Sequence, residues 1–410
     1  MWTPETIRND FPILDQAVNG RQLIYLDNAA TTQMPTPVME AMTSYMLHDH
    51  SNVHRGIHAL SERATGLMEK SREYVYSFLG AKGTEEIIFT SGATAAINLV
   101  ARSMSFGLLE AGDEIITTEM EHHANLIPWQ EACRRTGAAL HVVPVTKEGE
   151  LDYGKLEALL SHHTKLVAVT AVSNVTGTVN DLDRIIRLAH DAGAWVLVDG
   201  SQAVRHGLLN MTAMDCDFFC FSGHKMMGPT GTGVLYGKRA VLEKLPPDTF
   251  GGGMVDQVFT DHATYGDLPF RLEAGTPNIM GIIGLGAAVN YLTGLGREKI
   301  AKAEDQLLAL AEKELMSRPQ IDILGSPSRR AGCISFNIRG CHCYDTAKLL
   351  DQLGVAMRSG HHCAEPLLAA FGKTGAVRLS PAFYNTEDEI LEAMKAIDRV
   401  IHLIERTSRK

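Results

Sequence analysis

The stretch that decides the fold is Trp195-Val196-Leu197-Val198-Asp199-Gly200-Ser201-Gln202. Its first part is an unbroken apolar run with two β-branched valines, which is typical of a strand buried on both faces. The carboxylate of Asp199 follows at the point where the strand ends and the chain turns. In open sheets of parallel strands, ligands bind at this carboxyl edge. Taken alone, Asp199 is nevertheless better explained as the N-cap of a helix than as a ligand-binding residue.

A second buried run leads into a loop that carries reactive side chains. The apolar residues Phe218–Phe221 are followed by Ser222-Gly223-His224-Lys225 and then by Gly228-Pro229-Thr230-Gly231. A lysine on such a loop serves either as a phosphate-binding charge or as a Schiff-base amine. The loop is not a Walker A loop, because the spacing Gly-x-x-x-x-Gly-Lys-Ser/Thr is absent. Since Lys225 follows the buried run so closely, a solvated surface position is disfavoured.

Strand and helix patterns alternate from about residue 23 to residue 240. The expected strands are 23–26, 86–90, 114–118, 140–144, 165–172, 194–199, 218–222 and 233–236. Amphipathic helical patterns lie between them, among others at 93–109, 126–136 and 182–192. This alternation predicts an α/β layer fold around a mostly parallel sheet.

The chain changes character near residue 246. Residues 246–278 are punctuated by proline and glycine and predict a long irregular region, which is usually functional or a domain junction. Two helices are then expected at about 281–295 and 299–318. The remainder predicts a small α+β unit with strands near 333–338 and 376–380 and helices at 346–353 and 386–405. We therefore expect a large domain of residues 21–290 and a smaller domain of residues 1–20 and 291–410.

Composition narrows the function classes. The 410 residues are 45% hydrophobic and 21% charged, and the formal net charge is −10, so nucleic acid is an unexpected partner. No apolar run is long enough to span a membrane, and the polar residues 1–12 lack the apolar core of a secretory signal. Seven cysteines are an odd count that fits free thiols in a reducing compartment. The expected location is therefore the cytoplasm.

Considered together, Asp199 and Lys225 indicate a cofactor site more strongly than either residue does alone. A carboxylate at one strand end and a lysine at the next are what pyridoxal phosphate requires: the lysine holds the aldehyde, and the carboxylate keeps the pyridine nitrogen protonated. The phosphate needs hydroxyl groups and N–H groups at the start of a helix. The small-residue turn Ser91-Gly92-Ala93-Thr94 fits this need, although a plain helix cap explains it equally well.

Three further segments carry candidate site residues. In Glu121-His122-His123-Ala124-Asn125, His122 can stack on a flat ring and exchange protons, although a capping histidine is the more common explanation. In Arg358-Ser359-Gly360-His361-His362-Cys363-Ala364-Glu365-Pro366, cationic neighbours favour a nucleophilic thiolate, and Glu365 opposes them. Adjacent side chains rarely converge on one metal ion, so we expect a nucleophile and no metal site. Arg378 fits either a substrate carboxylate or a surface ion pair.

Together these segments resemble the SufS-type cysteine desulfurases, which are pyridoxal phosphate enzymes of the class V aminotransferase family. The matching segments are 25–32, 54–58, 120–125, 128–129, 173–178, 199–202, 222–225, 228–231, 273–277, 358–366, 378 and 384–386. The resemblance implies an aspartate-aminotransferase-like fold of type I, with a large mostly parallel sheet domain and a smaller α+β domain. One departure concerns Glu365, which stands where the family usually has Met or Gln.

The resemblance also implies roles for individual residues. Lys225, Cys363 and His122 would be catalytic, as the Schiff-base lysine, the sulfur acceptor and the residue stacked on the cofactor ring. The implied cofactor-binding residues are Thr94, His122, Asn174, Asp199, Gln202, Ser222, His224, Lys225 and Thr276. The implied substrate-binding residues are Asn174, Arg378, Arg358 and His54. Thr276 would reach the phosphate of a neighbouring subunit, which implies a homodimer.

The implied activity is removal of sulfur from L-cysteine, which gives L-alanine and a persulfide on Cys363. An acceptor protein of SufE or SufU type would then take the sulfur for iron–sulfur cluster assembly. Selenocysteine lyase and cysteine sulfinate desulfinase are alternatives that share the same cofactor apparatus. Less favoured are an aminotransferase, which leaves Cys363 without a role, and a non-enzymatic sulfur or metal carrier that uses Cys341, Cys343 and Cys363.

Overall fold

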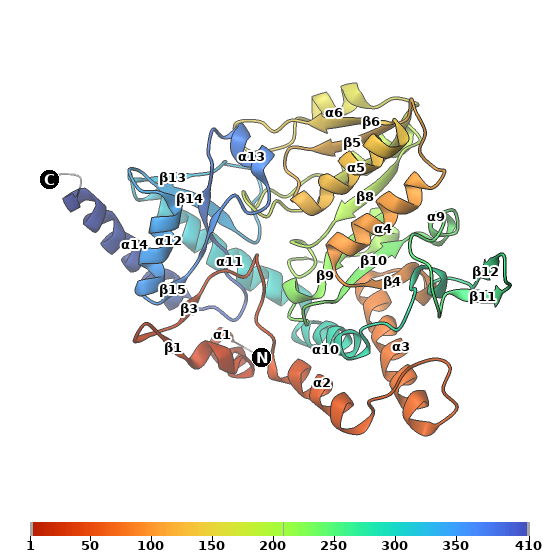
Figure 1. Ribbon diagram of the computed structural model, residues 1–410. Helices are drawn as coiled ribbons and strands as arrows, with labels where there is room; N and C mark the ends of the chain where they lie inside the picture. Colours follow the sequence, from red (N-terminus) through yellow and green to blue (C-terminus); the bar gives the residue numbers. More distant parts are fainter. Residues whose placement is uncertain (1–2, 208, 408–410) are drawn as a thin grey trace.

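A seven-stranded sheet forms the larger layer of the molecule (Figure 1). The computed structural model describes residues 3–207 and 209–407, so both ends of the predicted small domain, 1–2 and 408–410, lie outside the described residues. The strands are β4 (Ile87–Thr90), β5 (Glu114–Thr118), β6 (Ala139–Val143), β7 (Thr164–Thr170), β8 (Trp195–Asp199), β9 (Phe218–Ser222) and β10 (Gly233–Gly237). Their order is β4-β10-β9-β8-β7-β5-β6, and only β10 runs antiparallel to its neighbours. The prediction of a mostly parallel sheet is confirmed.

Both faces of this sheet are buried, as the apolar runs predict. In β8, Val196 and Val198 point into one core and Leu197 points into the other, and all three are fully buried. The first core includes helices α2 (Thr36–His48), α3 (Ala59–Leu79), α7 (Leu182–Asp191) and α10 (Ile279–Leu295). The second includes α4 (Ala93–Ser105) and α5 (Ile127–Thr136). Apolar side chains on alternate sides of each strand therefore hold the helices against both faces.

A second, four-stranded antiparallel sheet lies beside the first (Figure 1). Its order is β13 (Ile321–Ile323), β14 (Ile334–Ile338), β17 (Ala376–Leu379) and β16 (Arg358–Gly360). Its apolar residues share a core with helices α11 (Arg297–Met316), α12 (Cys343–Gln352) and α14 (Glu387–Thr407). The small α+β unit expected after residue 320 is thus present.

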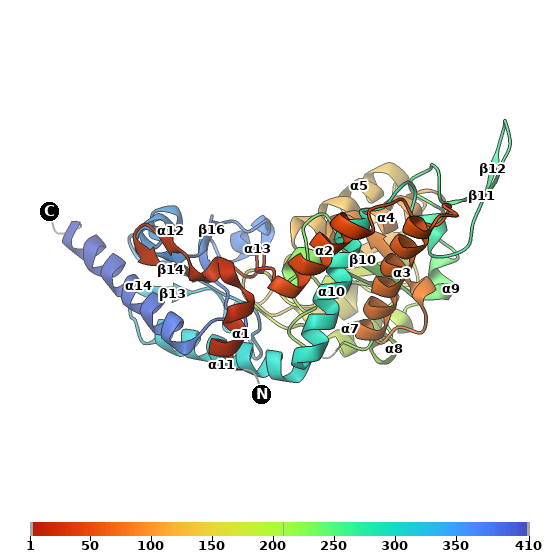
Figure 2. The same cartoon turned by 90° about the horizontal axis from the view of Figure 1, so that it is seen from below.

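Two expectations need correction. The strand expected at 23–26 is β3 (Ile24–Tyr25), and it pairs with β15 (Val355–Ala356) and not with the large sheet. The reason is packing, since Leu26 is buried in the core of the four-stranded sheet. Within the region expected to be irregular, β11 (Val255–Val258) and β12 (Ala263–Tyr265) form a hairpin that projects from the body of the molecule (Figure 2).

The remaining elements are short and lie mainly in connections. They are α1 (Pro4–Ile7), β1 (Ala17–Val18), β2 (Arg21–Gln22), α6 (Tyr153–Leu159), α8 (Met211–Met214), α9 (Arg239–Leu242), α13 (Glu365–Ala370) and several 3-10 turns. No single helix among the described residues is long and apolar enough to cross a membrane. Only α10 and α11 taken together have the length and composition, and they are bent by 81° at their junction.

A buried ion pair ties α3 to the segment that precedes Thr276. Arg72 is 1% exposed, and its Nη1 and Nη2 atoms lie 2.7 and 3.0 Å from the two carboxylate oxygens of Glu273. The N–H of Phe89, in β4, also donates to Glu273 at 2.6 Å. The pair therefore joins a helix, a sheet strand and a loop.

Replacing Glu273 with alanine should destabilise the fold strongly. The change leaves the buried guanidinium of Arg72 without its main counter-charge, and breaking a buried pair on one side costs about 3–5 kcal/mol. The measurement is the free energy of unfolding in urea. The control is Glu243→Ala, which breaks an exposed pair with Arg239 and should leave stability unchanged. Equal stability of the two variants would contradict the role given to Glu273.

Candidate active site

A cavity of about 410 Å³ lies between the carboxyl edge of the large sheet and the four-stranded sheet. Residues from both sheets line it, so neither sheet forms the cavity alone. Of the predicted site residues, it is lined by Thr94, His122, Asn174, Asp199, Ser222, His224, Lys225, Arg358, Cys363 and Arg378. Ala29, Ala30, Thr31, Ala93, Ala124, Ser201, Thr230 and His362 complete the wall.

Asp199 and Lys225 meet because their strands are parallel neighbours. Asp199 pairs with Cys220 of β9, so the ends of β8 and β9 lie at the same edge, and the 3-10 turn Gly223–Lys225 follows directly. The carboxylate of Asp199 is 5% exposed and accepts a hydrogen bond of 2.9 Å from the N–H of Ser201. Burial lowers the pKa of Lys225, and the carboxylate of Asp199 opposes this shift. The lysine is therefore closer to its neutral, nucleophilic form than an exposed lysine is.

The N-terminus of α4 faces the same cavity. Thr90 at the end of β4 and Ser222 at the end of β9 both pair with Gly233, which brings the turn before α4 beside Ser222. The N–H of Ala93 donates to Ser222 Oγ at 2.8 Å. Gly92 has a φ of +153°, and a Cβ atom there would come within 3.3 Å of Ser222 Oγ. A helix N-terminus flanked by hydroxyl groups suits a phosphate dianion.

A buried, hydrogen-bonded carboxyl group supports the loop that carries His122. Burial, reinforced by Lys225, lowers the pKa of His122 to about 4, so its imidazole is neutral at neutral pH. Beneath it, Glu121 is fully buried and accepts hydrogen bonds from Thr118 Oγ1, Asn125 Nδ2 and the N–H of Thr170 at 2.6–2.9 Å. Burial raises the pKa of Glu121 to about 8 against these three donors. This support for the histidine loop was not predicted, because Glu121 gave no signal of its own in the sequence.

Arg378 is held by contacts on two sides of its guanidinium. Its Nη1 donates to the carbonyl of Asn174 at 2.8 Å, and its Nη2 lies 3.4 Å from Asp27 Oδ1. Arg358 binds the same carboxylate at 3.0 Å. The Nε–H of Arg378 is buried without a hydrogen-bond partner. A buried guanidinium with a free donor is what a substrate carboxylate requires.

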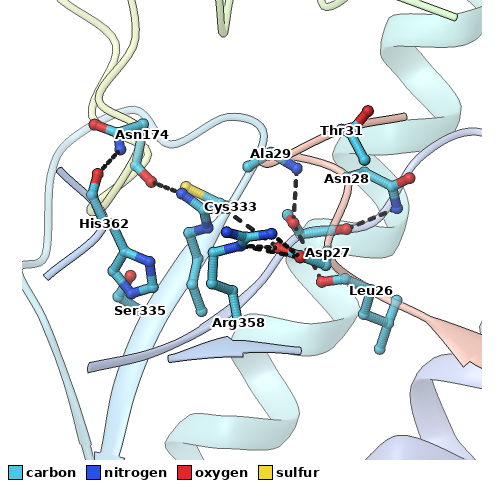
Figure 3. A network of polar contacts seen from close by, with 12 residues as sticks. Leu26, Asp27, Asn28, Ala29, Thr31, Asn174, Cys333, Ser335, Arg358 and His362 are labelled. Carbon is cyan, nitrogen blue, oxygen red and sulfur yellow. Dashed lines mark hydrogen bonds and ion pairs between the residues drawn. The ribbon is translucent and has the colours of Figure 1, made fainter. Parts of the chain in front are cut away.

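The loop that carries Cys363 is held in an unusual backbone conformation. His362 and Cys363 have φ values of 53° and 55°, a left-handed region that side chains rarely adopt. Asn174 Nδ2 donates to the carbonyl of His362 at 2.7 Å (Figure 3), and the N–H of His123 donates to the carbonyl of Cys363 at 2.7 Å. These bonds keep the thiol residue at the cavity wall.

Three of the predicted residues are not in this cavity. Gln202 lies behind the wall, where its Nε2 donates to the carbonyl of Ala29 at 2.8 Å. Thr276 and His54 line a different cavity of about 460 Å³, together with residues near the base of the β11–β12 hairpin. Both are exposed within this chain. Within one chain, the structure therefore brings neither Thr276 nor His54 to Lys225.

The residues of the cavity fit pyridoxal phosphate. Lys225 can hold the aldehyde, Asp199 lies where a pyridinium nitrogen needs an anion, and the start of α4 with Ser222 offers donors to the phosphate. A side chain at position 92 would crowd Ser222 Oγ, and glycine avoids this contact. The buried Nε–H of Arg378 remains available to a second anionic group.

The neutral histidines of the cavity predict an acid-sensitive fold. Burial lowers the pKa of His122 and His224 to about 4 and that of His362 to about 3, whereas an unfolded histidine titrates near ~6.5. Between these pH values the unfolded chain binds protons that the folded chain does not. Through these three groups, the free energy of unfolding of the cofactor-free protein should fall as the pH drops from about 6.5 toward 4, and the raised pKa of Glu121 offsets part of this fall.

The variant His362→Gln tests this dependence. Glutamine keeps an N–H donor for the carbonyl of Ala376, which His362 Nε2 contacts at 2.9 Å, but it cannot bind a proton. Urea unfolding between pH 4.5 and 7 should show a shallower loss of stability in the variant than in the wild type. Identical slopes would show that His362 does not contribute.

Comparison with known proteins agrees with this geometry. Residues 24–392 match the family model described as aminotransferase class-V. A curated cysteine desulfurase of Dickeya dadantii (strain 3937) is 48% identical over 401 residues, which cover 98% of this chain and 97% of that protein. The crystal structure of the cysteine desulfurase CsdA (S-sulfonic acid) from Escherichia coli is 39% identical, with a TM-score of 0.90 and coverage of 98% and 99% of the two chains.

A second solved structure, the apo cysteine desulfurase of Thermococcus onnurineus NA1, is 38% identical. It superposes with a TM-score of 0.92 over 99% of both chains. Family model, sequence relatives and structures thus cover nearly the whole chain. The predicted type I fold is confirmed, and the chain belongs to the class V aminotransferase family, among its cysteine desulfurases.

Proposed function

We propose that this protein takes the sulfur of L-cysteine as a persulfide on Cys363 and releases L-alanine, with pyridoxal phosphate as its cofactor. The observation that carries the proposal is one shared cavity: Lys225 and Asp199 come to it from the large sheet, and Arg378 and Cys363 come from the smaller one. Relatives named cysteine desulfurases, at 47–48% identity over nearly the full chain, support the same reaction.

When bound, pyridoxal phosphate supplies an electron sink for the charge left on an amino acid's Cα atom. Thr94, Ser222 and His224 surround the place where its phosphate fits, and His122 offers a neutral ring to the face of the pyridine. Asp199 would supply the negative charge that keeps the ring nitrogen protonated. We assign Asn174 and Gln202 to the side of the ring hydroxyl, with Gln202 acting through the wall residue Ala29.

Lys225 is the residue that handles the substrate's Cα proton. It is partly buried, and burial lowers its pKa, which favours the neutral amine that can take this proton. The carboxylate of Asp199 opposes part of this effect, because it favours the charged form of the lysine. The neutral imidazole of His122 lines the same cavity and is placed to assist with a second proton.

The substrate's carboxylate fits against Arg378. The free Nε–H of that residue supplies one donor, and the guanidinium is already oriented by Asn174 and Asp27. Arg358 also binds the carboxylate of Asp27, and it lies at the rim of the cavity, where its side chain is half exposed. Pre-orientation of this kind lowers the entropic cost of binding a small amino acid.

Cys363 completes the reaction. Its sulfur attacks the sulfur of the bound cysteine, an S–S bond forms, and the substrate's C–S bond breaks. The substrate carbon takes up a proton and leaves as L-alanine, and the enzyme keeps the sulfur as a Cys363 persulfide. The exposed side of the loop lets an acceptor approach, and we propose a SufE- or SufU-type protein that serves iron–sulfur cluster assembly.

A homodimer accounts for the residues outside the cavity. Thr276 and His54 lie together in the second cavity, and Ile57 and Phe250 nearby in the sequence are 97% and 61% exposed. Large apolar side chains left in water favour a protein partner. We propose that a second copy covers this face and receives Thr276 at its phosphate site and His54 at its substrate site.

Two further proposals concern organisation and location. The two separate sheets support two domains, which we propose to be a large one of residues 21–290 and a small one of residues 1–20 and 291–410, with β3 and Leu26 packed against the smaller unit. All seven cysteines are free, which supports a cytoplasmic location.

Replacing Cys363 with alanine tests the reaction. The holoenzyme of the variant should keep the visible absorbance of pyridoxal phosphate, because Lys225 and Asp199 are intact. It should form no persulfide and release alanine from L-cysteine only at background level. Persulfide and alanine are measured by mass spectrometry and by amino-acid analysis.

The matched control is Cys341→Ala, a partly exposed cysteine outside the cavity, which should behave as wild type. Sulfur transfer at the wild-type rate by the Cys363→Ala variant would overturn the proposal. Turnover of selenocysteine or cysteine sulfinate, with none of L-cysteine, would move the assignment to the lyase or desulfinase activities.

A further inference from the structure

We propose that His123, His361 and Glu365 form a binding site for a divalent transition-metal ion, with Zn²⁺ as the probe, beside Cys363. One ligand atom from each side chain lies within 4.8 Å of the other two. His123 comes from the loop after β5, whereas His361 and Glu365 come from the loop after β16 and the start of α13. Both loops border the active-site cavity, so an ion bound here would bridge them.

The side chains are already aligned for a common ligand. The rings of His123 and His361 are stacked with centroids 5.8 Å apart and planes 26° from parallel. His123 Nε2 lies 3.4 Å from Glu365 Oε2. Among the residues that the structure describes, that nitrogen accepts one hydrogen bond, a long one of 3.4 Å from the N–H of Glu365. Glu365 is 65% exposed, so ions in solution can reach the cluster.

The donor set matches the chemistry of zinc. Two imidazole nitrogens and one carboxylate oxygen are the protein ligands of many zinc sites that keep an open fourth position. Cys363 lies between His361 and Glu365 in the sequence and lines the cavity. Its Sγ atom is not among the ligand atoms that lie within 4.8 Å of one another, so the thiol would fill the open position as a thiolate only after the loop moves.

Ion binding is coupled to the Cys363 loop through His361. In the structure the N–H of Cys363 donates to His361 Nδ1 at 3.1 Å. If Nδ1 binds the ion, its lone pair is used; if Nε2 binds the ion, Nδ1 carries the ring proton. Either way the hydrogen bond from Cys363 is lost. The strained loop would therefore rearrange as the ion binds.

Glu365 gives this chain its anionic ligand. The family pattern has Met or Gln at this position, and neither offers a carboxylate. The exposed pair His162 and His163, with ring centroids 3.9 Å apart, is a natural comparison. In the part of the chain that the structure describes, only the His123 cluster adds a third ligand to such a pair.

The test is a Zn²⁺ titration of the holoenzyme against a coloured chelator. One ion per chain should bind, and Glu365→Gln and His361→Gln should each weaken binding by about 10-fold or more. The double variant His162→Gln, His163→Gln should bind as wild type does. Unchanged affinity in both Glu365→Gln and His361→Gln would overturn the site, even if Cys363→Ala lost binding.

A second measurement tests the consequence for sulfur transfer, which rests on the proposed function. Zn²⁺ should inhibit alanine release from L-cysteine, and a chelator should reverse the inhibition, with a phosphine as reductant because dithiols bind the ion. Glu365→Gln should keep its basal activity but need about 10-fold more Zn²⁺ for inhibition. Equal sensitivity to Zn²⁺ would overturn this consequence. An enzyme without desulfurase activity would instead refute the proposed function and leave the titration as a test of the site.

Discussion

Hydrogen bonds along residues 27–32 hold the two sheets at a fixed distance, and the active-site cavity depends on them. On one side, the N–H of Asn28 donates to the carbonyl of Ser380, which directly follows β17, and the N–H of Ala29 donates to Ser380 Oγ at 2.9 Å. On the other side, Thr32 binds the carbonyl of His224 through both its N–H and its hydroxyl. Because these groups are buried, each needs its partner, and the segment cannot slide. Lys225 is therefore held opposite Arg378.

The same segment explains the charge balance of the site. Asp27 is a single carboxylate shared by Arg358 and Arg378, so the pair of cations keeps an excess of positive charge. The start of α4 lines the same cavity with Ala93 and Thr94 and adds the positive end of a helix dipole. A cavity with these two poles suits a ligand pair with a phosphate at one end and a carboxylate at the other. Asp199 supplies the one negative charge between them.

Much of this could be predicted from local sequence. The strands β8 and β9, and with them Asp199 and Lys225, follow from apolar runs that end in polar turns, because burial and period are local properties. Cys363 was found by the chemistry of its neighbours, whereas the role of Arg378 was implied by the resemblance to a known family. Pairings between distant segments could not be found in this way. Asp27 and Arg358 are 331 residues apart, and nothing in either segment specifies the other.

Long-range packing also explains what was missed or misplaced. The strand at residue 24 was expected in the large sheet, but the burial of Leu26 in the other core decides its partner. The cluster of His123, His361 and Glu365 could not be predicted from neighbours in the sequence. His123 comes from a different loop and lies 242 residues before Glu365. Thr276 and His54 line a different cavity of the same chain, and the roles that the resemblance implies for them depend on the homodimer that we propose.

The central claim is that Lys225, held opposite Arg378 by residues 27–32, bears the cofactor. The most direct measurement is to fix pyridoxal phosphate to the purified holoenzyme with borohydride, digest the protein and locate the added mass by mass spectrometry. The account predicts one modified site, on the peptide that contains Lys225. Modification of a different lysine, or no modification in a protein with the bound cofactor's absorbance, would contradict it.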